Sequence, residues 1–281
     1  MNHISSIADI KKIMSENNLV FHKGLGQNFL FDEHYLNAIV ESGDITKEDV
    51  VIEIGPGLGV MTTRLAEKAK KVIAIEIDNN IVPVLKNITA PFGNVEIICA
   101  DIMKTDVNSL IADEEHIKVV ANLPYYITTP IIMKLLEEKI NAECIVVMIQ
   151  KEVAERLVAK AGSKDYGAIT LAIDYYTDSK IMFNVPAGAF VPAPKVESAV
   201  VKMDIRHLPA VKVNDVSFMF SIIKAAFGQR RKTFVNAVNS YLKIDKATII
   251  EALITCGYDE RVRGEVLSLQ DFAKLSDFLQ K

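Results

Sequence analysis

The chain has 281 residues, of which 50% are hydrophobic and 24% are charged, with a formal net charge of −4 at pH 7. This composition is typical of a globular protein, and the length suits one large and one small domain. No apolar stretch is long enough to span a membrane and the N-terminus lacks a signal peptide, so we expect a cytoplasmic protein. The three cysteines lie far apart, without a disulfide framework or metal-ligand spacing, and we expect Cys99 and Cys144 to be buried free thiols.

The N-terminal part combines a helix with a polar loop. Apolar residues at helical spacing predict an amphipathic helix over residues 5–17. A loop with two glycines follows over residues 21–30, and its amides Gln27 and Asn28 either fold over a ligand or give ordinary loop polarity. Asp32 is a good N-cap for the next helix, whose apolar side chains are expected to face inward.

The central stretch of the chain is Val50-Val-Ile-Glu53-Ile-Gly55-Pro-Gly-Leu-Gly59. Its β-branched residues predict a parallel strand covered on both faces, and its glycines allow a tight turn that approaches a ligand closely. The spacing Gly-x-Gly-x-Gly differs from the dinucleotide fingerprint, and Glu53 suits a cationic ligand better than a diphosphate. S-adenosylmethionine has a ribose, a sulfonium and an ammonium group but no phosphate, so this stretch favours it over a turn without a ligand.

Two further strands are expected to end in carboxylates. The strand over residues 71–78 brings Glu76 about 20 residues after the glycines, where nucleoside-binding units place the carboxylate that holds ribose hydroxyls. The next strand, over residues 95–101, ends in Asp101. Since ligands gather at the carboxyl ends of parallel strands, Asp101 either accepts a hydrogen bond from an adenine amino group or caps the following turn.

The predicted chemistry lies in Asn122-Leu123-Pro124-Tyr125, which follows the fourth strand. An exocyclic adenine amine is a poor nucleophile because its lone pair is delocalised, so its methylation needs acceptors that hold both amine hydrogens. The side-chain oxygen of Asn122 and a backbone carbonyl near Leu123, fixed by Pro124, are candidates for these acceptors. Tyr125 can stack on a flipped-out base. The alternative interpretation is a plain turn after a strand.

The alternation of strands and helices up to residue 160 predicts a parallel, doubly wound α/β sheet. Strands over residues 179–185 and 196–205, joined by a proline-rich connection without a helix, are expected to pair antiparallel at the sheet edge. Beyond residue 207 only helical periodicities occur. We therefore predict one domain over residues 1–207 and a small all-helical domain over residues 208–281.

These residues carry a resemblance to a known family that extends from Gly24 to about residue 240. Its motifs are Gly26-Gln-Asn-Phe-Leu30, Glu53-Ile-Gly-Pro-Gly-Leu-Gly59, Glu76-Ile-Asp78, Asp101, Asn122-Leu-Pro-Tyr-Tyr126, Gln150-Lys-Glu152, Phe190-Val-Pro-Ala-Pro-Lys-Val196 and Ala226-Phe-Gly-Gln-Arg-Arg-Lys232. The chain resembles the bacterial ribosomal RNA small-subunit adenine dimethyltransferases. The resemblance implies a Rossmann-like class I methyltransferase sheet and transfer of four methyl groups from S-adenosylmethionine, without a metal. The acceptors are the N6 atoms of two adjacent adenines in the 3′-terminal stem-loop of small-subunit (16S) ribosomal RNA.

The resemblance also assigns site residues. It implies that the donor is bound by Asn28, Leu30, Gly55, Glu76, Asp101 and Asn122. It implies that the target base is held by Asn122, Leu123, Tyr125 and Phe190.

The negative net charge argues mildly against binding to nucleic acid, but the placement of the basic residues can still allow it. Arg230, Arg231 and Lys232 are consecutive in a stretch expected to be helical, and Lys195, Lys202 and Arg206 lie around the edge strands. A local patch is sufficient for phosphate binding, although most charge runs are only solvated helix faces. We expect Lys195 and the residues 230–232 to contact RNA.

Three alternatives remain open. Macrolide-resistance methyltransferases share Asn-x-Pro-Tyr but modify large-subunit RNA, and DNA adenine methyltransferases usually have two prolines in this motif. A third possibility is an RNA-binding assembly factor that checks an immature 30S particle and whose methylation is secondary. We expect a monomer in each case.

Overall fold

The computed structural model describes residue 4, residues 6–20 and residues 26–280, which form two units. One unit comprises the described residues up to Ala154 together with Lys180–Ile205, and the other comprises Glu155–Ser179 and the residues from Arg206 onward. The sequence-based boundary at residue 207 assigned residues 155–179 to the first domain. They belong to the second unit because side chains such as Tyr166 and Leu171 are buried in its hydrophobic core.

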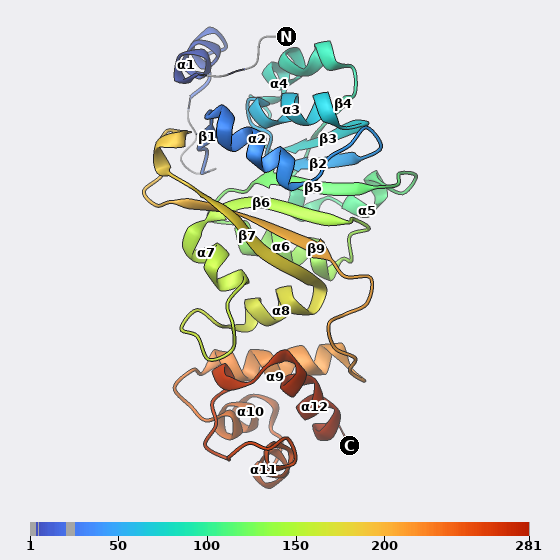
Figure 1. The fold of residues 1–281 in the computed structure, drawn as a ribbon, viewed down its shortest axis with the longest axis vertical. Helices are drawn as coiled ribbons and strands as arrows, with labels where there is room; N and C mark the ends of the chain where they lie inside the picture. Colours follow the sequence, from blue (N-terminus) through green and yellow to red (C-terminus); the bar gives the residue numbers. More distant parts are fainter. Residues whose placement is uncertain (1–3, 5, 21–25, 281) are drawn as a thin grey trace. The chain divides into compact units, whose positions relative to one another are not determined.

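The first unit contains a seven-stranded sheet with the order β4-β3-β2-β5-β6-β9-β7 (Figure 1). Its strands are β2 (Val50–Ile54), β3 (Lys71–Glu76), β4 (Val95–Cys99), β5 (Ile117–Asn122), β6 (Cys144–Gln150), β7 (Thr177–Val185) and β9 (Ser198–Ile205). The first unit contains β7 from Lys180 onward. Strands β2 to β6 pair in parallel, whereas β9 pairs antiparallel with β6 from Cys144↔Asp204 to Gln150↔Ser198. The predicted parallel sheet with an antiparallel strand towards its edge is confirmed.

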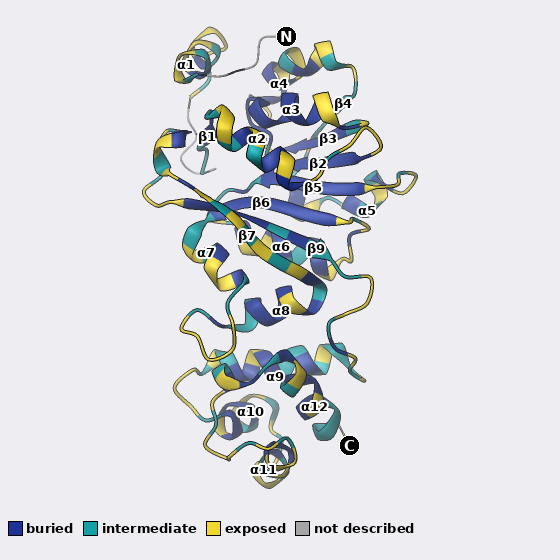
Figure 2. Ribbon diagram, viewed as in Figure 1, coloured by how far each residue is buried: buried dark blue, intermediate teal, exposed yellow. Residues whose placement is uncertain are grey.

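Helices alternate with these strands. They are α1 (Ile7–Glu16), α2 (Glu33–Ser42), α3 (Val60–Lys68), α4 (Val82–Thr89), α5 (Val107–Leu110), α6 (Thr128–Glu137) and α7 (Lys151–Leu157). Asp32 caps α2 as predicted, because its side chain accepts a hydrogen bond from the backbone N–H of His34 at 3.0 Å. The strands β2, β5 and β6 are buried along almost their whole length, as β-branched strands covered on both faces are (Figure 2).

Only one of the two strand cysteines is buried, so the expectation for Cys99 was wrong. Cys144 lies in β6 with 4% of its surface exposed, whereas Cys99 is exposed at the end of β4. Strand β4 is the outermost strand on its side of the sheet, which the apolar sequence alone does not reveal. The Cys99 thiol donates to Oδ1 of Asn79 at 2.6 Å.

The second unit is helical. It contains α8 (Ala168–Tyr176), α9 (Val216–Gly228), α10 (Phe234–Leu242), α11 (Lys246–Thr255) and α12 (Leu269–Leu279). Its core includes Phe234 and Phe272, whose ring centroids are 6.1 Å apart in an edge-to-face arrangement. Within the described ranges, the chain contains no helix that is both long and apolar enough to cross a membrane.

Candidate active site

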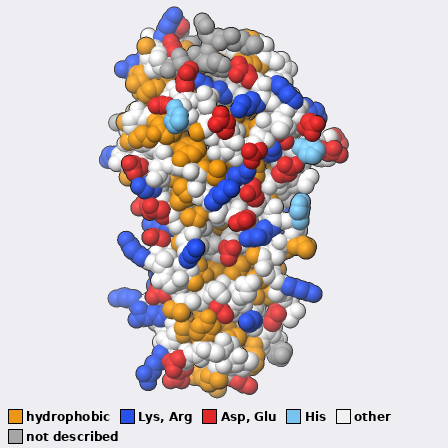
Figure 3. Space-filling view, viewed as in Figure 1, with side chains coloured by type: hydrophobic (Ala, Val, Ile, Leu, Met, Phe, Trp, Pro, Cys, Tyr) orange, Lys and Arg blue, Asp and Glu red, His pale blue; other side chains and the backbone are white. Residues whose placement is uncertain are grey.

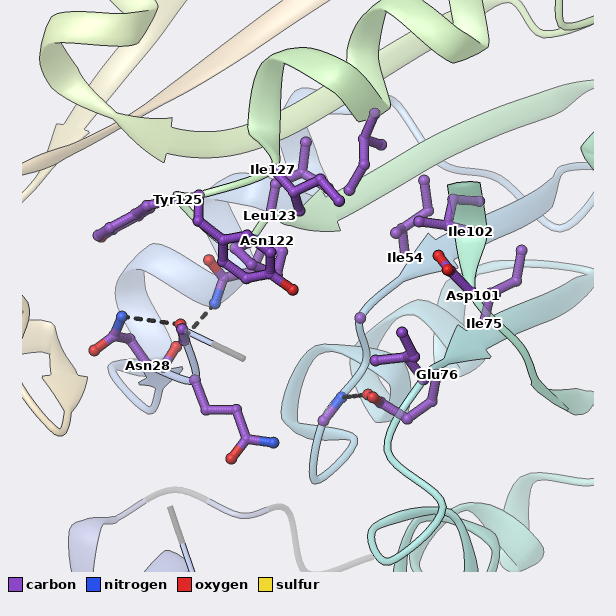
Figure 4. Close-up of a pocket in the computed structure, with 18 of the residues that line it drawn as sticks. Asn28, Ile54, Ile75, Glu76, Asp101, Ile102, Asn122, Leu123, Tyr125 and Ile127 are labelled. Atoms are coloured by element: carbon purple, nitrogen blue, oxygen red, sulfur yellow. Dashed lines mark hydrogen bonds between the residues drawn. The ribbon is translucent and has the colours of Figure 1, made fainter. Parts of the chain in front are cut away.

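A pocket opens at the carboxyl ends of the parallel strands of the first unit (Figure 4). It is lined by residues 26–29, 54–55, 57, 75–77, 100–102, 122–127 and 131. Four predicted donor-binding residues are therefore brought together with the predicted catalytic segment of residues 122–125. These four are Asn28, Gly55, Glu76 and Asp101.

The glycine turn shapes one wall of this pocket. Gly57 has a φ of +57°, and a Cβ atom there would lie 2.6 Å from the ring of Phe29, so only glycine fits without a shift. The backbone N–H of Gly55 donates to the carbonyl of Ile75 at 3.0 Å, which joins the turn to β3. The turn is thus held against the strand that carries Glu76.

Glu76 is a fixed, buried carboxylate at the end of β3, with 5% of its surface exposed. One of its oxygens accepts from the N–H of Gly57 at 3.0 Å (Figure 4). The other accepts from the N–H of Asp78 at 2.9 Å. Burial raises the pKa of Glu76 above its ordinary value. Both oxygens retain lone pairs that can accept from the hydroxyls of a ligand.

Asp101 caps the turn that follows it, which is one of the two roles that its sequence position left open. Its Oδ1 caps the short helix Ile102–Lys104 by accepting from the N–H of Met103 at 3.0 Å. Its Oδ2 lies 3.8 Å from Nζ of Lys104, and the side chain lines the pocket. The second oxygen can therefore accept from a polar group of a ligand.

The side-chain amide of Asn122 is held in one orientation. Its Nδ2 donates to the backbone carbonyl of Asn28 at 3.0 Å, and Nδ2 of Asn28 donates to the carbonyl of Gly26 at 3.2 Å (Figure 4). Because the donor end of the amide is already bonded, Oδ1 of Asn122 is the acceptor that it can offer to a ligand. The following turn is fixed by Pro124, whose carbonyl accepts from the N–H of Ile127 and the hydroxyl of Thr128.

The loop around residues 26–30 closes this part of the site, and Nε2 of Gln27 donates to Oδ2 of Asp78 at 3.2 Å. Its neighbouring residues 21–25 lie outside the described residues, so the first part of the predicted loop is not described. Leu30 lies in β1 (Phe29–Leu30), which pairs antiparallel with β8 (Phe190–Val191) in the register Leu30↔Phe190. Leu30 lines a smaller neighbouring cavity together with Glu53.

Glu53 has no exposed surface, and neither carboxylate oxygen has a hydrogen-bond partner among the described residues. Burial raises its pKa to about 8. An unpartnered buried carboxylate is costly, and a cation in the cavity would compensate this cost. Gly55 and Asn122 line both cavities, which places Glu53 next to the main pocket.

Two of the predicted base-binding residues have different surroundings. Tyr125 lines the pocket, and its hydroxyl lies 2.6 Å from Oγ of Ser198. Phe190 is buried with 3% exposure where β8 pairs with β1, and it is not among the residues that line the pocket. Sequence reasoning did not select Ile77, Ile102 or Tyr126, which also line the pocket and directly follow selected residues.

The consecutive basic residues lie in the second unit and not on a helix, so the helical expectation for them was wrong. Helix α9 ends at Gly228 and α10 begins at Phe234 with Thr233 as its N-cap. Arg230 is bound within its own unit, since its guanidinium donates to the carbonyls of Lys164 and Tyr166 at 3.0 and 3.1 Å. Arg231 and Lys232 are exposed.

The other basic residues of the expected patch also differ from one another. Lys195 is exposed, whereas Lys202 pairs with Asp44 at 2.7 Å and Arg206 donates to the carbonyl of Thr177 at 3.0 Å. Positive and negative side chains are interspersed on the face shown in Figure 3. The cations with internal partners have less capacity to bind phosphate than Lys195, Arg231 and Lys232.

The doubly wound sheet, the glycine turn and the carboxylates at the strand ends define a Rossmann-like methyltransferase. The chain belongs to the ribosomal RNA adenine dimethylase family, which it matches over residues 18–281. It is 48% identical to ribosomal RNA small subunit methyltransferase A of Alkaliphilus metalliredigens, with 98% of each chain covered. It is 49% identical to the protein of the same name from Bacillus pumilus, over 96% of this chain and 95% of the relative.

Solved structures show the same fold. A dimethyladenosine transferase from Plasmodium falciparum superimposes with a TM-score of 0.72 at 26% identity, covering 87% of this chain and 94% of that one. The 23S rRNA methyltransferase ErmE superimposes with a TM-score of 0.69 at 22% identity, covering 90% of this chain and all of that one. The predicted α/β methyltransferase fold with a helical C-terminal region is confirmed.

Proposed function

We propose that this chain methylates N6 of two adjacent adenines in the 3′-terminal stem-loop of small-subunit ribosomal RNA, with S-adenosylmethionine as the donor. The observation that carries the proposal is the fixed amide of Asn122 in the pocket that also contains the Glu76 carboxylate. An acceptor for a base amine and an acceptor for ribose hydroxyls in one pocket suit a transfer between a nucleoside donor and a base.

The residues of the pocket fit the groups of the donor. S-adenosylmethionine supplies a methyl group on a cationic sulfur and also carries adenine, ribose and an amino-acid end. Glu76 would accept from the ribose hydroxyls, and Asp101 from the adenine amine. The unpartnered Glu53 would attract the ammonium group, beside the backbone of Gly55. Asn28 and Leu30 would enclose the same amino-acid end.

The catalytic segment would prepare the target nitrogen. Oδ1 of Asn122 and the backbone carbonyl near Leu123 accept the two amine hydrogens and favour a pyramidal nitrogen, while Pro124 keeps this turn in place. Tyr125 stacks on the base, and Phe190 supports this wall through its pairing with Leu30. The methylated nitrogen loses a proton after the transfer, so no strong base is needed.

Exposed cations would bind the RNA backbone. Lys195, Arg231 and Lys232 are suited to phosphate contacts, and Arg230 braces the loop that carries two of them. We propose an immature 30S particle in the cytoplasm as the partner and a monomer as the active form.

The proposal is tested by incubating small-subunit and large-subunit particles with the protein and labelled donor, followed by mass spectrometry of the nucleosides. We expect N6,N6-dimethyladenosine in small-subunit RNA only. Modification confined to large-subunit RNA would support the macrolide-resistance alternative instead, and absence of donor-dependent modification in both would refute the proposal.

A second role as an assembly factor is favoured by one observation. The exposed basic residues Arg231 and Lys232 belong to the second unit, whereas all residues that line the pocket belong to the first unit. RNA binding can therefore persist when donor binding is lost. Cells that express Glu76→Ala in place of the wild type would accumulate immature subunits with the variant bound if this second role exists.

A further inference from the structure

We propose that Ser198 is a positioning residue for the methyl transfer, which holds the ring of Tyr125 in the place where it stacks on the target adenine. The inference rests on the function proposed above. Oγ of Ser198 lies 2.6 Å from the Tyr125 hydroxyl, and either oxygen can be the donor. The stacking residue is thereby bonded to a strand that is far from it in the sequence.

Ser198 is itself firmly placed. It is the first residue of β9, has no exposed surface, and lies opposite Gln150 at the end of β6. The adjacent N–H of Lys151 donates to the carbonyl of Glu197 at 3.0 Å, which extends the pairing by one residue. The Ser198 hydroxyl therefore has a fixed position from which it can hold the hydroxyl end of Tyr125.

A tyrosine ring can leave its position by rotation about χ1, which swings the whole ring about the Cα–Cβ bond. The hydroxyl oxygen lies at the far end of the ring, so a hydrogen bond there opposes this swing and keeps the ring in place. Burial raises the pKa of Tyr125, so its hydroxyl stays protonated at neutral pH. Removal of the Tyr125 hydroxyl leaves the buried Ser198 oxygen without this partner, which makes the pair sensitive to mutation.

The segment that carries Ser198 also connects two walls of the pocket. Upstream of Ser198 the chain forms β8, which pairs with β1 through Phe29↔Val191 and Leu30↔Phe190. Phe29 lines the same pocket as Tyr125. The segment from β8 to Ser198 is thus bonded both to β1, in the loop proposed to bind the donor, and to the Tyr125 ring, proposed to bind the base. Ser198 would keep the Tyr125 ring at a fixed position relative to the bound donor.

A double-mutant cycle tests this role with Ser198→Ala, Tyr125→Phe and the combined variant. We expect each single change to lower the single-turnover methylation rate about threefold to tenfold at saturating donor and particle, as loss of one hydrogen bond does. The combined variant is expected to be no slower than the slower single variant, since both partners of one bond are then removed. The KM for the particle and the affinity for the donor are expected to stay unchanged. Tyr125→Ala is expected to be slower than all three, because it also removes the stacking surface.

Ser276→Ala is a matched control, because Ser276 is equally buried but lies on α12 in the second unit. Its rate is expected to equal that of the wild type. A wild-type rate for Ser198→Ala, or multiplicative effects in the combined variant, would overturn the positioning role. A loss of rate that is matched by a loss of folded protein on thermal melting would also overturn it. These outcomes presuppose a wild-type protein that dimethylates adenine, whereas an inactive wild type would refute the proposed function itself.

Discussion

The side chain of Asn122 and the backbone of Asn28 are joined by a hydrogen bond of 3.0 Å, in which Nδ2 of Asn122 is the donor. The residue proposed to act on the target base is therefore oriented by the loop proposed to enclose the donor. This bond decides which end of the amide is offered to a ligand, and Oδ1 is the end that accepts. A well-placed acceptor needs no reorganisation when the amine becomes pyramidal.

We predict that Asn122→Ala lowers the single-turnover methylation rate by a factor on the order of 10²–10³, as removal of one preorganised polar group does elsewhere. Donor affinity is expected to change much less, because the amide acts mainly in the transition state. Single-turnover kinetics with saturating donor and particle isolates this step.

Asn122→Asp is an informative companion, because aspartate keeps an acceptor but cannot donate to the carbonyl of Asn28. We expect it to be impaired as well, since the orientation of the side chain is lost. A wild-type rate for Asn122→Ala would mean that residues 122–125 are a structural turn and that the acceptor lies elsewhere.

We predict that Glu76→Ala weakens S-adenosylmethionine binding by about 1.5–3 kcal/mol, the scale of hydrogen bonds to a charged acceptor. The carboxylate is held by the N–H groups of Gly57 and Asp78, which keeps its remaining lone pairs in place for the ribose hydroxyls. Titration calorimetry measures the effect, with Glu137→Ala on the exposed end of α6 as the control. An unchanged donor affinity would refute the assignment of Glu76.

Local patterns were sufficient to predict the central sheet. The β-branched run Val50–Ile54 and the glycines after it determine a buried strand and a tight turn through short-range preferences, and both occur as predicted. Carboxyl ends of parallel strands meet at one edge, so Glu76 and Asp101 could be placed in one pocket without further information.

Long-range partners could not be predicted in this way. The exposure of Cys99 depends on the position of β4 at the sheet edge, and the burial of Phe190 depends on its pairing with Leu30. The hydrogen bond between Tyr125 and Ser198 spans 73 residues. The guanidinium of Arg230 is bonded to a loop 64 to 66 residues away, which a run of three basic residues does not indicate.

We predict that replacing Arg230, Arg231 and Lys232 together by Ala weakens binding to the small-subunit particle and flattens its salt dependence, because fewer counterions are released. Donor affinity is expected to stay unchanged. Binding measured over a series of salt concentrations gives the slope, and a wild-type slope would show that these residues are only solvated.

The structure indicates that the three residues contribute differently to RNA binding and to stability. Arg231→Ala with Lys232→Ala is expected to account for most of the change in slope, because Arg230, although it is exposed too, is bonded to backbone carbonyls of its own unit. Arg230→Ala alone is expected to lower the stability of the loop instead, since it removes the bonds to the carbonyls of Lys164 and Tyr166. Thermal melting of the three variants separates loss of stability from loss of phosphate contacts.

The last prediction concerns Glu53, whose burial raises its pKa from 4.5 to about 8. Between these two values the unfolded chain has released this proton while the folded chain retains it, so the free energy of unfolding falls as the pH rises through this window. We predict that Glu53→Gln reduces the loss of stability between pH 5 and pH 8, because its amide does not titrate. Denaturant unfolding at both pH values measures the difference, and the comparison with the wild type cancels the contributions of groups that do not interact with Glu53.

Donor binding gives a second, independent test of Glu53. If Glu53 holds the ammonium group, the bound donor favours the ionised carboxylate, and binding at pH 7 releases a proton in the wild type but not in Glu53→Gln. Titration calorimetry in two buffers of different ionisation enthalpy detects this proton, and equal proton release by both proteins would exclude Glu53 from the donor site.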